Sequence, residues 1–338
     1  MTMGAFRLER PRSIADAVSI LAAHGPDAMI LAGGTDVVPN LQMKLFSPRV
    51  VVDIKSLARA SHLAAIEWSP ENGLRIGALA TLTSICASAL IQEKFPVLAA
   101  AVSTIAGPLQ RNMGTIGGNL CLETRCQWYN QSDFWRKSLG GCLKKDGPIC
   151  HVAPGGKVCW AAWSGDAAPA LLTLDAEIEI AGPAGTRRIP LAQFYKNDGM
   201  ERIALGRDEL LIAVCVPSRM AGRRGNYHKL RVRNSIDYPL AGVAISMDLD
   251  SRGICRNARL ALTAVNPAPL LVEEASDWLV GQAASPELID RVAQQAIRTA
   301  KPLTTSGSTP VYRRDMVRVF TRRALEEAWR QSNGKLSS

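Results

Sequence analysis

Cysteines gather in one part of this 338-residue sequence, directly after a glycine-rich turn. Five of the eight cysteines fall between positions 121 and 159, and the glycine turn occupies positions 114–119. Glycine turns can bring backbone N–H groups close to the phosphates of a cofactor, and clustered thiolates bind zinc or iron–sulfur clusters. The sequence therefore predicts two redox centres side by side.

Four of the cysteines form the predicted metal site, with the spacing Cys126-x15-Cys142-x7-Cys150-x8-Cys159. Structural zinc sites usually contain close C-x2-C pairs, and this stretch has none. Wide and irregular spacing is typical of ligands that come from separate turns of a loop around something larger than one ion. It favours a [4Fe–4S] cluster, while structural zinc remains the alternative. Cys121 lies outside this spacing, and we assign it no metal role.

A second glycine turn, Gly33-Gly34, follows a short apolar stretch and precedes Thr35-Asp36. Neither turn matches the dinucleotide fingerprint G-x-G-x-x-G or the P-loop. Each turn alone is weak evidence for a ligand site, since most such turns only reverse the chain. Two of them in one N-terminal region suit a pyrophosphate, because its two negative groups accept hydrogen bonds from both sides.

Short helices and strands must position these turns. Apolar periodicity predicts a helix after Ser13, strands at 28–32, 50–54 and 74–78, and helices at 83–93 and 96–106. From position 175 the pattern becomes that of an antiparallel sheet followed by helices. The expected strands are 177–180 and 187–190, which form a hairpin, then 210–216, 227–232, 241–249 and 259–265, and the expected helices are 273–281, 286–300 and 313–330.

The composition is that of an ordinary globular protein, with 47% hydrophobic and 21% charged residues. No apolar run is long enough for a membrane span, and the first ten residues lack a signal-peptide core. We therefore expect a cytoplasmic protein, in which clustered cysteines bind metal. The net charge of +10 comes without a nucleic-acid motif, so it indicates a solvated basic surface or docking to an acidic redox partner. The four histidines show no acid–base pattern, and no catalytic residue is assigned.

The order of these motifs resembles the FAD-binding subunits of molybdenum hydroxylases, the family that includes xanthine dehydrogenase and carbon monoxide dehydrogenase. The matching segments are Ala32–Asp36, Gly114–Leu120, Ser164–Asp166, Tyr227–Arg231 and Tyr312–Arg314, and the resemblance covers nearly the whole chain. An insertion between about Arg125 and Ser164 carries the four cysteines. It is similar to the insertion in the β subunit of 4-hydroxybenzoyl-CoA reductase, which holds an extra [4Fe–4S] cluster.

The resemblance implies an α+β protein, with a two-subdomain FAD-binding fold of the vanillyl-alcohol-oxidase (PCMH) type and a small C-terminal α+β domain. The expected FAD-binding domain is 1–218, with subdomains 1–56 and 57–218 and the iron–sulfur loop at about 122–163, and the C-terminal domain is 219–330. The first turn would hold the pyrophosphate, the second would close on it, Asp166 would contact the adenosine part, and Lys229 would approach the flavin. The residues expected to bind FAD are Ala32, Gly33, Gly34, Thr35, Asp36, Thr115, Gly117, Gly118, Asn119, Asp166 and Lys229.

The resemblance also implies electron transfer. Ferredoxin would reduce the cluster, and electrons would pass through FAD to the [2Fe–2S] centres of a small partner subunit and to molybdenum in a large one. The complex, a dimer of heterotrimers, would convert 4-hydroxybenzoyl-CoA to benzoyl-CoA. Basic residues of the insertion, among them Lys144 and Lys145, would dock the acidic ferredoxin. Two alternatives stay open: the FAD subunit of another molybdenum hydroxylase that passes electrons outward, and a binding module held together by zinc.

Overall fold

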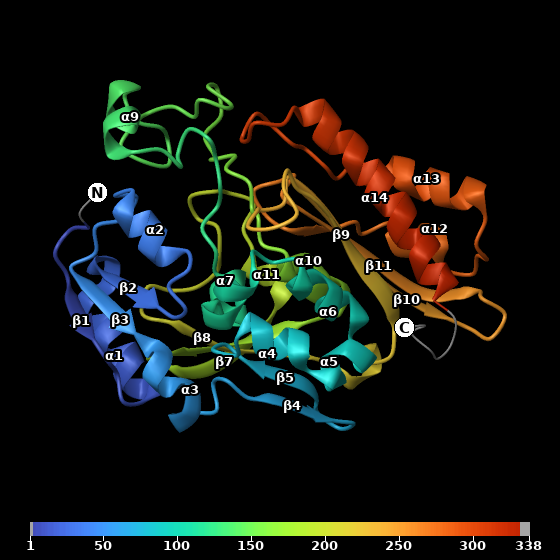
Figure 1. Cartoon of the computed structure of the whole chain (residues 1–338), viewed down its shortest axis with the longest axis horizontal. Coiled ribbons are helices and arrows are strands. Elements are labelled where there is room, and N and C mark those ends of the chain that lie inside the picture. Colours follow the sequence, from blue (N-terminus) through green and yellow to red (C-terminus); the bar gives the residue numbers. More distant parts are fainter. Residues whose placement is uncertain (1–2, 332–338) are drawn as a thin grey trace.

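The computed structural model describes residues 3–331 and contains an N-terminal α/β unit, a central sheet with its helices and a C-terminal sheet with its helices (Figure 1). A long extension, drawn in green in Figure 1, leaves the central unit and lies above the N-terminal unit. This extension is the cysteine-rich insertion. The architecture is α+β, as the sequence predicts.

The N-terminal unit is a three-stranded parallel sheet with strand order β1-β3-β2. Its strands are β1 (Arg7–Glu9), β2 (Ala28–Leu31) and β3 (Val50–Asp53), and its helices are α1 (Ile14–His24), α2 (Val37–Gln42) and α3 (Leu57–Ala60). The helix predicted after Ser13 is confirmed, and the Ser13 hydroxyl caps it by accepting a hydrogen bond from the Asp16 amide at 3.0 Å. The sequence pattern does not predict β1, because this strand has only three residues, largely exposed.

The central unit is a five-stranded antiparallel sheet with strand order β4-β5-β8-β6-β7. The predicted hairpin of β6 and β7 is confirmed. The helix predicted at 83–93 is interrupted at Ser88, whose backbone is extended and whose hydroxyl caps the next helix. The strands are β4 (Ile66–Ser69), β5 (Gly73–Gly77), β6 (Glu177–Gly182), β7 (Gly185–Pro190) and β8 (Leu210–Val216). The helices are α4 (Leu82–Ala87), α5 (Ala89–Lys94), α6 (Pro96–Ser103), α7 (Pro108–Met113), α8 (Ile116–Leu120), α10 (Ala167–Thr173) and α11 (Leu191–Phe194).

The C-terminal unit is a four-stranded antiparallel sheet with strand order β12-β11-β10-β9. Its strands are β9 (Arg224–Leu230), β10 (Ala241–Leu249), β11 (Cys255–Thr263) and β12 (Leu270–Leu271), and its helices are α12 (Ala275–Leu279), α13 (Pro286–Ala296) and α14 (Pro310–Arg330). On β10, Ala244 packs into the core of the central unit, whereas Val243 and Ile245 pack with the C-terminal helices. The sheet is therefore buried on both faces, one of them against the central unit.

A buried ion pair joins the C-terminal sheet to the central unit. Lys229 on β9 donates to Asp166 at the start of α10 at 3.0 Å and to the Thr104 carbonyl at 3.1 Å, and the Tyr227 hydroxyl donates to Asp166 at 2.7 Å. The Asp166 and Lys229 side chains are at most 4% exposed. Burial raises the pKa of Asp166, and the charge of Lys229 opposes that shift. Each of these two side chains therefore needs the opposite charge of the other to stay buried in its charged form.

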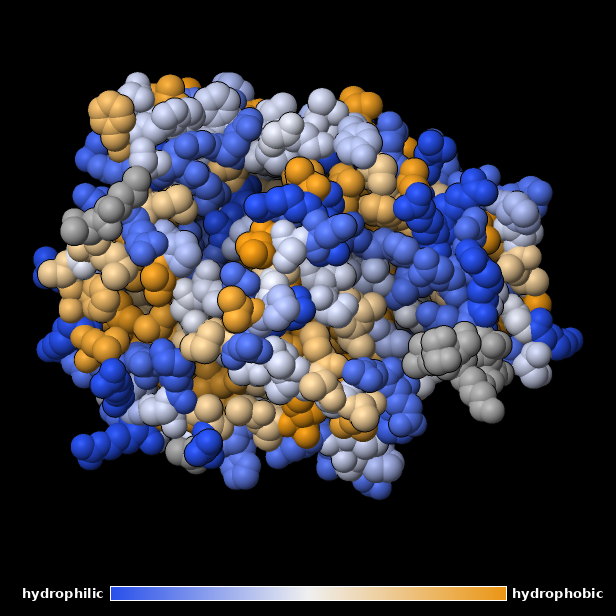
Figure 2. Space-filling view, in the orientation of Figure 1, coloured by the Kyte–Doolittle hydropathy of each residue, from blue (hydrophilic) through white to orange (hydrophobic). Residues whose placement is uncertain are grey.

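Hydrophobic and hydrophilic side chains lie on different parts of the outer surface (Figure 2). Figure 2 shows hydrophobic side chains gathered over the N-terminal unit, while the surface of the C-terminal helices is mostly hydrophilic. None of the helices in residues 3–331 is both long and apolar enough to cross a membrane. The expected domain boundary at 218–219 falls in a 3-10 turn, Ser218–Met220, between β8 and β9, and the boundary itself stays a prediction.

Replacing Lys229 by Met should leave the Asp166 carboxylate buried without its counter-ion. We expect the free energy of unfolding, measured by chemical denaturation, to fall by about 3–5 kcal/mol. Lys196→Met is the control, because Lys196 is exposed and pairs with Glu201 at the surface. It should change stability by less than about 0.5 kcal/mol. A loss below about 1 kcal/mol for Lys229→Met would contradict a structural role of the pair.

Candidate functional site

The first glycine turn offers backbone N–H groups that no protein acceptor uses. Within the described residues, the amides of positions 33–36 donate no hydrogen bond, while the Gly34 carbonyl accepts one from Val38 at 3.0 Å. Gly34 has a φ of +77°, a left-handed conformation that favours glycine. Free amides in a glycine turn are donors that a pyrophosphate can use.

The second glycine turn differs, because the amides of Gly117, Gly118 and Asn119 already have acceptors. Gly117 donates to the Ala78 carbonyl at 2.9 Å, Gly118 to the Thr115 hydroxyl at 3.1 Å, and Asn119 to the Thr115 carbonyl at 2.9 Å. A Cβ at Gly117 would lie 2.8 Å from the Ala78 carbonyl oxygen, so glycine is needed here for close packing. The structure gives this turn a packing role, and its contact with FAD stays a prediction.

The two turns lie against each other. A Cβ on Gly33 would be 2.0 Å from the Met113 carbonyl oxygen, and a Cβ on Gly114 would be 3.5 Å from the Thr35 hydroxyl. Only glycine at position 33 permits this approach. The fold therefore brings together the two turns that the sequence assigns to one cofactor.

Asp36, the last residue of the first turn, binds residues from other parts of the fold. Arg125 of the insertion forms an ion pair with its carboxylate, and the Tyr238 hydroxyl and the Asn40 side-chain amide each donate to it at 3.0 Å. The Arg125 guanidinium also lies over the Tyr238 ring, 4.3 Å from its centre. Arg125 thus neutralises a carboxylate that would otherwise repel phosphate.

The insertion is closed at its base by Arg125 and Ala162, which exchange two backbone hydrogen bonds of 2.7 Å. It contains one short helix, α9 (Asp133–Ser138), which the sequence does not predict. Gln127 reaches the C-terminal unit, because its backbone amide donates to the Thr305 carbonyl at 2.8 Å and its side chain to the Thr304 carbonyl at 3.0 Å. The insertion therefore contacts both the first glycine turn and the C-terminal unit.

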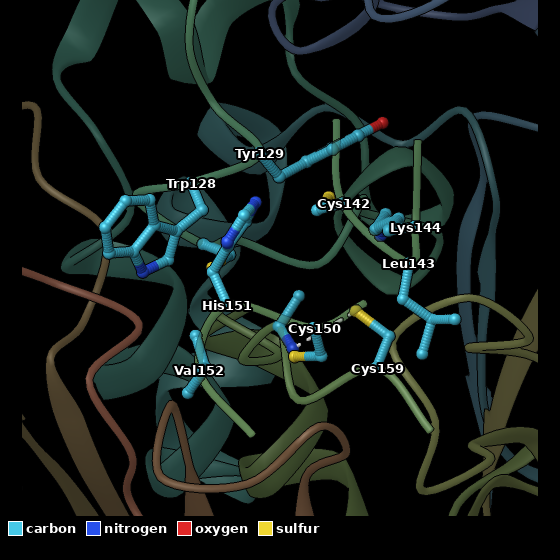
Figure 3. A pocket seen from close by; sticks show the side chains of 11 residues that line it. Trp128, Tyr129, Cys142, Leu143, Lys144, Cys150, His151, Val152 and Cys159 are labelled. Atoms are coloured by element: carbon cyan, nitrogen blue, oxygen red, sulfur yellow. Dashed lines mark hydrogen bonds between the residues drawn. The ribbon is translucent and has the colours of Figure 1, made fainter. Parts of the chain in front are cut away.

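All four predicted cysteine ligands line one cavity inside the insertion (Figure 3). Cys126, Cys142, Cys150 and Cys159 are each at most 8% exposed, and none forms a disulfide. Burial raises the pKa of Cys159 to about 11. Among residues 3–331, no group of three or more His, Cys, Asp or Glu side chains is arranged around one metal ion. The four cysteines therefore share one cavity without forming a preset site for a single metal ion.

Aromatic side chains cover this cavity, and the residues present fit an iron–sulfur group. Trp128, Tyr129 and His151 line it, and the Trp128 ring centre lies 5.2 Å from that of His151 and 5.9 Å from that of Trp135. Such cover excludes water from a metal site. Among residues 3–331, no acceptor bonds the buried Trp128 indole N–H, and an N–H of this kind can donate a hydrogen bond to the sulfur atoms of a cluster.

Lys144 also lies in the cavity wall, and the prediction that it docks an acidic partner is wrong. Its side chain is 7% exposed, pairs with Glu123, donates to the Gly199 carbonyl at 2.6 Å and lies 4.7 Å from the centre of the Tyr129 ring. Burial alone would raise the pKa of Glu123, but the charges of Lys144 and Arg202 outweigh it and lower that pKa. The charge of Lys144 is thus used inside the protein, where no partner can reach it.

Cys121 stands apart from the four-cysteine cavity. It packs against the hydrophobic core of the central unit, next to the second turn, and its carbonyl accepts a hydrogen bond from Arg202 at 3.2 Å. This position gives Cys121 different neighbours from Cys126, which packs with Leu45 and Tyr129.

Asp166 and Lys229 bind each other rather than an open site. The resemblance assigns them to opposite ends of FAD, whereas the structure places their side chains 3.0 Å apart in the interior. The contacts show that the pair joins the central and C-terminal units. A direct contact of either residue with FAD stays a prediction.

Exposed apolar side chains lie near the glycine turns, and the sequence pattern did not single them out. Leu109 and Met113 on α7 are 78% and 50% exposed, and Ile236 and Tyr238 are exposed in the loop before β10. The Ile236 amide donates to the Ala106 carbonyl at 3.2 Å, which holds that loop beside α7. Apolar surface next to free amides fits a cofactor that has an aromatic ring system and a pyrophosphate, as FAD does.

Replacing Gly33 by Ala should push the two turns apart, because the new Cβ would overlap the Met113 carbonyl. Overpacking of this kind costs about 1–3 kcal/mol, so we expect the affinity for FAD, measured by flavin fluorescence titration, to fall about tenfold or more. Gly307→Ala is the matched control, since its Cβ would meet nothing within 4 Å. Unchanged FAD affinity in Gly33→Ala would show that the first turn is not part of the FAD site.

Known proteins match this chain over nearly its whole length. Residues 4–219 match the FAD binding domain in molybdopterin dehydrogenase, and residues 226–328 match the CO dehydrogenase flavoprotein C-terminal domain. The carbon monoxide dehydrogenase medium chain of Afipia carboxidovorans is 31% identical, over 97% of this chain and 98% of that protein. The xanthine dehydrogenase FAD-binding subunit of Escherichia coli O157:H7 is 28% identical, over 97% of each.

Solved structures of the same family are also similar to this chain. A chain of the Cu,Mo-CO dehydrogenase in its cyanide-inactivated form is similar with a TM-score of 0.80 and 29% identity, over 98% of this chain and all of that one. The expected fold, with an FAD-binding domain followed by a small C-terminal domain, is confirmed. The chain belongs to the molybdenum hydroxylase family, as one of its FAD-binding medium subunits.

Proposed function

We propose that this subunit transfers electrons between FAD at the glycine turns and a [4Fe–4S] cluster held by Cys126, Cys142, Cys150 and Cys159. The observation that carries the proposal is the convergence of these four buried cysteines on one cavity. Four thiolates of one loop are a typical ligand set for such a cluster. The cluster, when bound, supplies one-electron chemistry, and the chain's own residues hold it and exclude water.

The proposal includes partner subunits. Relatives of this chain are named medium chains and FAD-binding subunits, which supports an assembly with a large molybdenum subunit and a small [2Fe–2S] subunit, as a dimer of heterotrimers. Met3, Phe6 and Leu8 are exposed at and before β1, which is an edge strand. Figure 2 shows hydrophobic side chains gathered over this unit. An apolar edge of this kind is a typical docking surface.

The direction of electron flow has two candidates. The relatives are named dehydrogenases, which favours flow from molybdenum through FAD to an outside acceptor. The insertion favours the reverse direction, from ferredoxin through the cluster and FAD to molybdenum, for reductive removal of the phenolic hydroxyl of 4-hydroxybenzoyl-CoA. The names of the relatives support the first candidate better. A cluster potential far below that of the bound FAD would favour the second.

The proposal is tested by the visible spectrum and the metal content of anaerobically purified protein. We expect flavin bands, a broad shoulder that dithionite bleaches, and the iron of one [4Fe–4S] cluster per chain. Cys150→Ser should lose the iron and the shoulder, because it removes one ligand from the cavity. Cys121→Ser is the matched control and should keep both, since Cys121 lies outside the cavity.

Two results would contradict the proposal. Zinc in place of iron would favour a binding module with structural zinc. Full iron content in Cys150→Ser would show that the cluster, if present, uses other ligands.

A further inference from the structure

Helix α2 is held at both ends by arginines of the cysteine insertion. At its N-terminal end, Arg125 pairs with Asp36, the residue that precedes the helix. At its C-terminal end, the Arg136 guanidinium of α9 donates to the Lys44 carbonyl at 3.0 Å and to the Met43 carbonyl at 3.5 Å. Figure 1 shows α9 and α2 as neighbours at one end of the molecule.

Arg136 is built into the interior rather than exposed to a partner. Its side chain is 4% exposed, and it also donates to the Gln131 carbonyl within its own loop. The next residue on α9, Lys137, is 73% exposed and pairs with Asp133 at the surface. Carbonyl groups that follow a helix lack partners within the helix, and a buried guanidinium satisfies them here.

The segment after α2 packs against the cysteines of the insertion. Leu45 is 1% exposed and packs in one hydrophobic cluster with Cys126, Cys142 and Cys159. The segment before α2 is the first glycine turn, whose amides are free to bind FAD. Helix α2 therefore connects the two sites, with the first glycine turn before it and Leu45, which packs against the cysteines, after it.

We propose that Arg125 and Arg136 are positioning residues that couple occupancy of the four-cysteine site to FAD binding through helix α2. The inference rests on the proposed function, in which the cysteines hold an iron–sulfur cluster. Residues 125–162 contain only one six-residue helix, and their four cysteines line one cavity. If these thiolates hold the cluster of the proposed function, the folding of this loop depends on the metal. Without metal the loop loosens, the arginines leave α2, and the glycine turn loses its fixed position.

The coupling is measured as the difference in FAD affinity between two forms of the full chain. One form is reconstituted with iron and sulfide, and the other is freed of metal by a chelator. Coupling between sites typically amounts to about 5–150-fold, and we expect the metal-free form to bind FAD about tenfold more weakly. Equal FAD affinities of the two forms would overturn the proposal.

Variants of the two arginines test their role in FAD binding separately from the role of the metal. Arg136→Gln should keep the iron content of the reconstituted protein but bind FAD about tenfold more weakly, and removing metal should then change its FAD affinity little. Lys137→Gln is the matched control on the same helix and should behave like the unaltered protein. Arg125→Gln is the second variant if Arg136→Gln does not fold, and it should also weaken FAD binding.

The outcomes distinguish this inference from the function on which it rests. A protein that takes up no iron contradicts the cluster proposal, while Arg136→Gln and Lys137→Gln still decide whether α2 is positioned by Arg136. Unchanged FAD affinity in both arginine variants overturns the positioning role even if the cluster is present.

Discussion

The position of helix α2 is the constraint on which the rest of the site depends. A helix of six residues is too short to be stable by itself in water, so contacts from outside must fix it. The insertion supplies them through an ion pair before the helix and a buried guanidinium after it. The glycine turn, the approach of Gly33 to Met113 and the packing of Leu45 against the cysteines all follow from where this helix lies.

Much of the fold could be predicted from periodicity, because strands and helices of the sheets carry their own pattern. The hairpin of β6 and β7 and the helix after Ser13 are confirmed by the structure. Strand β1 is too short and too exposed to show a pattern. The break at Ser88 is a local capping preference that the apolar pattern of the segment hides.

Only the part of the candidate site that depends on the spacing of residues along the sequence could be predicted. The spacing of the cysteines indicated one shared site, and the four side chains do line one cavity. Pairings between distant residues could not be read from a single sequence, since 89 residues separate Arg125 from Asp36. Lys144 looked like a surface lysine beside Lys145, because nothing local shows that it pairs with Glu123 inside the protein.

The family determines the FAD-binding fold, and the insertion places four buried cysteines around one cavity beside it. The insertion is attached to the N-terminal unit through Arg125 and Arg136 and to the C-terminal unit through Gln127. An electron carrier benefits from such attachment, because fixed geometry keeps two redox groups at a constant separation. The same contacts that place a cluster would therefore also shape the flavin site.

Hydrogen exchange at the amides of α2 tests the positioning of this helix most directly. The account predicts that the amides of positions 40–42 exchange slowly in the iron-loaded protein and much faster once the metal is removed, while the amides of β10 stay equally protected in both forms. Equal exchange of α2 with and without metal would contradict the claim that the cysteine insertion holds the helix and, through it, the FAD turn.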